Sequence, residues 1–278
     1  MSRSMLRRIE EINQTSREIM GGDLSRRVPT SGTADDFDQL AVNLNAMLDE
    51  IERLMGGIRQ VSDNVAHDLR TPLTRLRNRL EQLRSELEDT SPHTEHVERS
   101  IAEADQLLST FGALLRIARI EAGGHRPVLV PVDLATLVRD AAELYEALAE
   151  EKRLTIDIAA SDSETIRGDR DLLFQAVTNL LDNAVKYTPD GGRVALGVSR
   201  AGDAVDVIVA DTGPGIPADE CDKVVERFYR LERSRRDPGS GLGLSLVSAV
   251  ARMHHGALVL EDNQPGLRAT LRFDVNPV

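Results

Sequence analysis

The feature that most constrains this chain is an apolar stripe whose members recur in alternating steps of four and three. The stripe consists of Leu40, Leu44, Met47, Ile51, Leu54, Ile58, Val61 and Val65, and continues as Leu69, Leu73, Leu76, Leu80, Leu83 and Leu87. A repeat of this kind lies along one side of a helix and is typical of a coiled coil. The steps from Val61 to Leu73 are three successive fours, a stutter that locally unwinds a coiled coil.

Two shorter stripes flank the long one. They consist of Met5, Ile9, Ile12, Ser16 and Ile19, and of Val97, Ile101, Ala104, Leu108, Phe111, Leu115 and Ala118. A short polar loop, residues 88–94, separates the last stripe from the long one, so we expect an antiparallel helical hairpin. One hairpin cannot cover its own apolar stripe. We therefore expect a homodimer in which two hairpins form a four-helix bundle.

The second half of the chain, after Gly123 and Gly124, alternates between strand and helix patterns. Strands are predicted at 154–159, 193–198, 204–209, 257–260 and 267–273, and helices at 133–150, 169–187 and 242–254. The predicted fold class is therefore a mainly α N-terminal half, with a coiled coil and a dimeric four-helix bundle, followed by an α/β domain of ordinary size.

Composition argues against several classes of function. The net charge is −12 and the sequence pI is about 5.0, whereas a nucleic-acid binder normally presents a basic surface. Cys221 is the single cysteine, so no intrachain disulfide can form, as is usual in a reducing compartment. No uncharged apolar stretch approaches the roughly 18 residues of a membrane span. We therefore expect the chain as given to be cytoplasmic and not to bind nucleic acid.

One segment of the second half carries polar residues suited to a nucleotide and its metal. Asn179, Asn183 and Lys186 lie at i, i+4 and i+7, so on a helix they share one face. Amide oxygens can ligate Mg²⁺, and a lysine can neutralise phosphate. The alternative is the polar solvent face of an amphipathic helix, and this segment alone leaves both interpretations open.

Two further segments are rich in glycine. Asp211 follows a predicted strand and precedes residues 212–216, Thr-Gly-Pro-Gly-Ile. A carboxylate there can accept a hydrogen bond from an amine such as that of adenine, and glycines let the backbone approach a ligand. Residues 239–244, Gly-Ser-Gly-Leu-Gly-Leu, lead into a helix whose N-terminus favours phosphate. A tight turn and a flexible loop are the alternatives. The charged segment 227–238 is expected to act as a lid.

A histidine lies inside the stutter of the long stripe. His67 is two residues from Val65 and two from Leu69, so it points away from the apolar seam. Pro72 cannot donate an N–H to the carbonyl of Asp68, and a kink is expected just after His67.

These segments, in this order, resemble the sensor histidine kinases of two-component systems. Residues 179–187, 211–216 and 239–244 match the N, G1 and G2 boxes of that family, and Phe228 and Arg230 match its F box. The sequence Val-Ala-His-Asp-Leu-Arg-Thr-Pro-Leu-Thr from residue 65 to 74 looks like its H box.

The N-terminal segment resembles a HAMP signal-relay module at residues 22–24, 28–29 and 44–47. It departs from that pattern in lacking the usual proline of the first helix, and in having Asp-Asp-Phe at 35–37 where Asp-Glu is common. The resemblance divides the chain into HAMP-like helices at 1–55, a dimerisation and phosphotransfer domain at 56–123, and a catalytic domain at 124–278.

The resemblance implies that the catalytic domain is an α/β sandwich of the Bergerat type that binds ATP and Mg²⁺. Asn183 and Asn179 would ligate the metal, Lys186 would face the phosphates, and Asp211 would hold the adenine amine. The nucleotide-binding residues implied by the resemblance are Asn179, Asn183, Lys186, Tyr187, Asp211, Gly213, Gly215, Ile216, Phe228, Arg230, Gly239, Gly241, Leu242, Gly243 and Leu244.

The implied activity is ATP-dependent autophosphorylation of His67 and transfer of the phosphoryl group to an aspartate of a response regulator. Asp68 would orient the imidazole and take up its proton, and Thr71 would position water to hydrolyse the partner's aspartyl phosphate, which makes the protein a kinase and a phosphatase. A longer parent protein would be anchored in the bacterial inner membrane upstream of residue 1. The alternatives are a Bergerat-fold ATPase, or a coiled-coil scaffold, without kinase activity.

Overall fold

The computed structural model describes most of the chain from residue 35 onward. The described residues are 9–10, 12–13, 15, 26–30, 32, 35–87, 91, 93–121, 129–159, 164–232 and 239–275. The stripe predicted from Met5 to Ile19 lies mainly outside these residues. No described helix combines the length and apolar character that a bilayer crossing requires.

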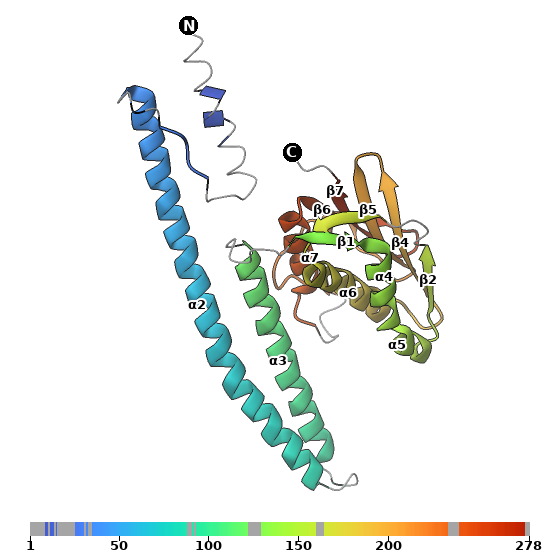
Figure 1. The fold of residues 1–278 in the computed structure, drawn as a ribbon. Helices are drawn as coiled ribbons and strands as arrows, with labels where there is room; N and C mark the ends of the chain where they lie inside the picture. Colours follow the sequence, from blue (N-terminus) through green and yellow to red (C-terminus); the bar gives the residue numbers. More distant parts are fainter. Residues whose placement is uncertain are drawn as a thin grey trace.

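Two long helices form the predicted hairpin (Figure 1). Helix α2 spans Asp36–Glu86 and α3 spans Thr94–Glu121. The Asp35 side chain caps α2 by accepting the N–H of Asp38, which satisfies one of the unpaired donors at a helix start. Pro72 lies inside α2 without ending it.

Two ion pairs set the register of the hairpin. Arg77 Nε lies 2.6 Å from Asp105 Oδ1, and Arg84 Nε lies 2.7 Å from Glu98 Oε1. Both pairs show the same offset, because seven residues forward on α2 correspond to seven residues backward on α3. The two helices therefore run antiparallel in steady register.

The second half is an α/β sandwich. Its elements in chain order are β1 (Val130–Asp133), α4 (Leu134–Glu143), α5 (Glu146–Glu151), β2 (Thr155–Ala159), β3 (Thr165–Gly168), α6 (Arg170–Tyr187), β4 (Arg193–Ala201), β5 (Ala204–Asp211), the 3₁₀ turn η1 (Ala218–Glu220), α7 (Gly243–Met253), β6 (Gly256–Asp262) and β7 (Leu267–Asp274). Five strands form a mixed sheet in the order β2-β4-β5-β7-β6, in which β2 and β4 are parallel and the other pairs antiparallel. Strands β1 and β3 form a separate antiparallel pair.

The core lies between the sheet and helices α4, α6 and α7. On the central strand β5, Val205, Val207 and Val209 are almost fully buried, whereas Ile208 between them is only half-buried. Asp206 and Ala210 on the opposite face are also buried, with 6% and 8% of their surface exposed, so the alternation expected of a strand with one covered face is incomplete. The sheet therefore presents Asp211, at the end of β5, to the layer between strands and helices.

The predicted order of a mainly helical N-terminal half and an α/β sandwich is confirmed, with local differences. The helix predicted at 133–150 is divided into α4 and α5 at Leu144 and Tyr145. The Tyr145 side chain turns toward α6 and donates its O–H to Thr178 O at 3.1 Å. Strands β1 and β3 were not predicted from the sequence, because four-residue strands are too short to show a clear alternation.

The end of α3 packs into the core of the α/β part. Ile117 is completely buried and Ile120 nearly so, and both belong to the same apolar cluster as α7. Polar contacts add to this packing: Arg116 donates to Gln175 of α6, and Glu121 pairs with Arg227. The hairpin is therefore docked against the α/β part through α3 (Figure 1).

Candidate active site

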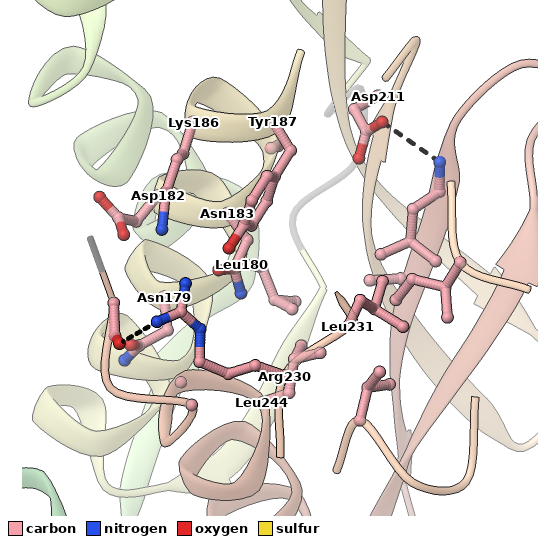
Figure 2. Close-up of a pocket in the computed structure, with 18 of the residues that line it drawn as sticks. Asn179, Leu180, Asp182, Asn183, Lys186, Tyr187, Asp211, Arg230, Leu231 and Leu244 are labelled. Atoms are coloured by element: carbon pink, nitrogen blue, oxygen red, sulfur yellow. Dashed lines mark hydrogen bonds between the residues drawn. The ribbon is translucent and has the colours of Figure 1, made fainter. Parts of the chain in front are cut away.

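A cavity of about 800 Å³ lies between α6, α3, the strands β5 and β7, described residues of the predicted lid, and the glycine-rich segment that follows it (Figure 2). This volume is in the range of small-molecule and cofactor sites. It is lined by Gln106, Ser109, Asn179, Leu180, Asp182, Asn183, Ala184, Lys186, Tyr187, Val209, Asp211, Pro214, Gly215, Ile216, Val224, Tyr229, Arg230, Leu231, Gly239, Ser240, Gly241, Gly243, Leu244, Leu267 and Ala269.

Helix α6 supplies one polar end of the cavity. Asp169 caps the helix by accepting two backbone N–H groups. Asn179, Asn183 and Lys186 lie on a half-buried side of α6, next to its fully buried face, and line the cavity. Asn179 Nδ2 donates to the carbonyl of Gln175 at 2.8 Å, which fixes how the amide is turned.

The start of α7 leaves space beside these amides. A Cβ atom on Gly243 would lie 3.5 Å from Asn179 Oδ1 and 3.6 Å from Asn183 Nδ2. Two side-chain amides beside a cationic Lys186 form a donor set suited to Mg²⁺, which prefers oxygen ligands and is commonly shared with phosphates. The residues present therefore fit a magnesium-bound polyphosphate.

Asp211 forms the opposite end of the cavity. Its Oδ1 accepts the N–H of Gly213 at 2.7 Å and that of Leu267 at 3.2 Å, and Figure 2 shows the other oxygen turned toward the cavity. Burial raises the pKa of this carboxyl, and the two N–H donors oppose that rise. The second oxygen can accept an amine hydrogen from a ligand.

A glycine that the sequence reasoning missed holds the Asp211 backbone. A Cβ atom on Gly266 would lie 1.8 Å from the carbonyl oxygen of Asp211, and the φ angle of Gly266 is +115°. Asn263 Nδ2 donates to the same carbonyl at 2.8 Å. The turn between β6 and β7 therefore packs directly on the adenine-binding candidate, a contact that only the folded chain reveals.

Described residues of the predicted lid, Tyr229 to Leu231, line the cavity. Arg230 Nη1 donates to Gly239 O at 3.0 Å, which ties together the two ends of the segment whose residues 233–238 lie outside the described chain. A Cβ atom on Gly239 would lie 3.0 Å from Lys186 Nζ. Two cationic groups therefore converge on this glycine.

Most of the predicted nucleotide-binding residues line the cavity, and three do not. Gly213 instead holds Asp211 through its N–H. Phe228 is 56% exposed, and its N–H donates to Gly241 O at 2.9 Å. Leu242, the N-cap residue of α7, is fully buried. These three residues shape the loops around the cavity rather than its surface.

Two residues behind α6 support the cavity. Burial, with a smaller contribution from the charge of Asp182, raises the pKa of Tyr145 to about 12, so its phenol stays protonated and holds Thr178 O. Lys152 Nζ donates to the carbonyls of Val185 (2.9 Å) and Lys186 (3.0 Å) at the end of α6. Such a cation is favourable at a helix C-terminus.

The predicted phosphoacceptor residues lie on α2. His67 is within the helix, but its side chain lies outside the described residues. Asp68 is exposed and Thr71 half-buried, one turn further along. The structure thus places these residues on the hairpin and the nucleotide-binding candidates in the α/β part.

Three family models match the chain in succession. They are the HAMP domain at residues 1–53, the His Kinase A (phospho-acceptor) domain at 57–123, and the histidine kinase-, DNA gyrase B-, and HSP90-like ATPase at 168–277. The signal transduction histidine-protein kinase/phosphatase MprB of Mycolicibacterium smegmatis is 33% identical over 273 residues, which cover 96% of this chain and 54% of that relative. The chain belongs to the sensor histidine kinases.

Other histidine kinases show the same relationship. The signal transduction histidine-protein kinase BaeS of Escherichia coli is 30% identical over 93% of this kinase and 55% of its own length. The structure of full-length ShkA in complex with AMPPNP has a TM-score of 0.66 at 31% identity, and the match covers 79% of this chain and 47% of ShkA. The chain spans about half the length of the curated relatives it matches.

Proposed function

We propose that this kinase binds ATP in the cavity between α6 and the sheet, transfers the terminal phosphoryl group to His67, and passes it to an aspartate of a response regulator. The observation that carries the proposal is the polarity of the cavity. A buried carboxylate, Asp211, stands at one end, and two amides with Lys186 stand at the other. This arrangement suits an adenine amine at one end and a metal-bound triphosphate at the other.

Each residue has a role that follows from its place. Asp211 Oδ2 would accept the adenine amine, and Asn183 and Asn179 would hold Mg²⁺ through their amide oxygens. The metal, when bound, neutralises charge on the phosphates, which is most of what phosphoryl transfer requires. Lys186 and Arg230, near Gly239, orient the terminal phosphate.

On the hairpin, His67 is the proposed nucleophile. An imidazole that attacks phosphorus loses the proton of its other nitrogen as positive charge builds. The neighbouring Asp68 is exposed on α2 and accepts that proton, which makes it a general base. The proposed domains are HAMP-like helices at 1–55, a dimerisation and phosphotransfer domain at 56–123, and a catalytic domain at 124–278.

The test is self-labelling of the intact chain with γ-labelled ATP and Mg²⁺. The wild-type chain is expected to form an acid-labile phosphohistidine, and His67→Gln to form none. Asn183→Ala is expected to lose Mg²⁺-dependent ATP binding measured by calorimetry. Label that persists in His67→Gln, or ATP affinity that survives Asn183→Ala, contradicts the assignment.

A phosphatase activity is a second proposed function. Relatives with 33% identity carry the name kinase/phosphatase, and Thr71 lies one helical turn after His67, where its hydroxyl can orient a water. Thr71→Ala is expected to keep self-labelling and to lose dephosphorylation of the receiver, whereas Asp68→Asn loses self-labelling. Equal loss of both activities in Thr71→Ala would assign Thr71 to the shape of the helix.

The proposed partners are a receiver domain and a second copy of the chain. Large apolar side chains on the long stripe remain exposed in a single chain, among them Leu40, Met47, Leu54, Leu76 and Leu83. A partner hairpin would bury them, so sedimentation is expected to give about twice the mass of 30.5 kDa. Membrane anchoring of a longer parent stays a prediction, and its support is the greater length of the curated relatives.

A further inference from the structure

Helix α3 carries a second face besides its hairpin stripe. Toward its end, Ala113 and Ile117 pack into the core of the α/β part. Gln106 and Ser109 are placed seven and four residues before Ala113, so they lie on the same face. Both line the nucleotide cavity. This face is therefore apolar where it docks and polar where it reaches the cavity.

The contact between Arg116 and Gln175 shows which end of the cavity α3 reaches. Gln175 lies one turn before Asn179 on α6 and accepts the Asn179 amide on its carbonyl. Ser109 lies seven residues before Arg116 on α3, about 10 Å at 1.5 Å per residue. Asn183 lies a similar distance after Gln175 on α6. Since both line one cavity, Ser109 stands near the amide end.

We propose that Gln106 and Ser109 bind the terminal phosphate of ATP, so that the nucleotide site is completed by the phosphoacceptor hairpin. This inference rests on the proposed function. A primary amide and a hydroxyl both donate hydrogen bonds to phosphate oxygens without adding charge. Gln106 Nε2 now donates to Thr110 Oγ1 at 3.3 Å, a long neutral bond that a charged phosphate oxygen outcompetes.

The consequence is a preference for the triphosphate. Asp211, at the other end of the cavity, contacts a part that ATP and ADP share, whereas Gln106 and Ser109 contact a group that ADP lacks. Docking of the hairpin and binding of the third phosphate therefore stabilise each other, because two linked equilibria must act reciprocally. The helix pair that carries His67 thereby distinguishes the two nucleotides.

The test compares the β,γ-imido analogue of ATP with ADP, each with Mg²⁺, by calorimetry on the intact chain. A hydrogen bond to a charged group contributes about 1.5–3 kcal/mol, so Gln106→Leu is expected to weaken the triphosphate analogue at least about tenfold. ADP affinity is expected to stay unchanged. Gln106→Glu is expected to weaken the triphosphate further through charge repulsion, and Ser109→Ala to act in the same direction.

The control is Gln82→Leu, because Gln82 is exposed on α2 and, in the described structure, its side chain donates to Glu86 of the same helix. It is expected to leave both affinities unchanged. Equal losses for the triphosphate and ADP in Gln106→Leu would overturn the proposal, as would unchanged triphosphate affinity in Gln106→Leu and Gln106→Glu. A wild-type chain that binds neither nucleotide would instead refute the proposed function.

Discussion

Replacing Asp211 with asparagine separates nucleotide binding from stability. In the structure, Oδ1 accepts two backbone N–H groups, from Gly213 and Leu267, and Oδ2 is turned to the cavity. An asparagine must keep its single oxygen on those two donors, so its NH₂ group faces the adenine amine. In that orientation the asparagine NH₂ group and the adenine amine are both donors, so no hydrogen bond forms between them. In the flipped orientation the NH₂ group faces the N–H donors of Gly213 and Leu267 instead.

The expected loss of affinity follows from that geometry. A hydrogen bond from a neutral donor to a charged acceptor contributes about 1.5–3 kcal/mol, which corresponds to roughly a 10- to 150-fold change in dissociation constant. The unpaired donor adds to this cost because Asp211 is buried. We therefore expect Asp211→Asn to weaken ATP and ADP alike by at least about tenfold.

The stability of the nucleotide-free protein is expected to change in the opposite direction. Burial raises the folded-state pKa of Asp211 above its unfolded value, so at pH 7 the ionised carboxylate costs folding free energy. That cost disappears as the pH falls through the folded-state pKa. Asp211→Asn removes the charge, so its melting temperature at pH 7 is expected to equal or exceed that of the wild type, with the advantage shrinking in acid.

The assays are calorimetric titration with ATP and thermal melts from pH 7 to pH 4. The matched control is Asp206→Asn on the same strand, because Asp206 pairs with Arg272 at 2.7 Å, outside the cavity. Its ATP affinity is expected to stay unchanged while its melting temperature falls. An Asp211→Asn protein that melts lower than wild type at pH 7, or binds ATP normally, would refute the reasoning.

Three further substitutions test the support of the site. Lys152→Met leaves helix C-terminal carbonyls without their donor and is expected to cost about 1–3 kcal/mol in urea unfolding, with partial rescue by Lys152→Arg. Gly266→Ala places a methyl group against Asp211 O and is expected to abolish ATP binding in calorimetry. Ile117→Ala opens a cavity at a fully buried position and is expected to cost about 2–5 kcal/mol, measured by unfolding of the intact chain; a cost below about 1 kcal/mol would show that α3 is not docked in solution.

The helices and the longer strands could be predicted because their patterns are local. Apart from the stutter between Val61 and Leu73, the seam from Leu40 to Leu87 is regular enough to predict α2 from spacing alone. The stripe from Val97 to Ala118 predicts α3 in the same way. The alternation of residue types at 204–209 likewise predicts strand β5. Asp133 and Asp169, predicted as helical, proved to be the N-caps of α4 and α6, a shift of one residue.

The parts that escaped prediction depend on contacts between distant segments. Gly266 is about 55 residues from Asp211, and its turn resembles any other until β7 pairs with β5. Gln106 and Ser109 read as ordinary polar positions of a hairpin helix, because nothing in their neighbourhood indicates that a second domain docks there. A sequence motif identifies residues of an unusual type or spacing. Single amide and hydroxyl side chains are common on helices, so they could not be singled out.

The register of the hairpin also relates the cavity to His67. The ion pairs Arg77–Asp105 and Arg84–Glu98, extended by equal steps, bring the backbone of His67 level with Leu115. The cavity meets α3 at 106–109, six to nine residues away, or about 9–14 Å along the helix. Phosphoryl transfer needs reacting atoms within about 3–3.5 Å. Under the proposed function, transfer within one chain would require the α/β part to move along the hairpin, and the contacts of Ile117 and Glu121 would resist this movement. A terminal phosphate held by Gln106 and Ser109 would add to that resistance, so the proposed contacts to ATP in the docked arrangement would also keep it from reacting there.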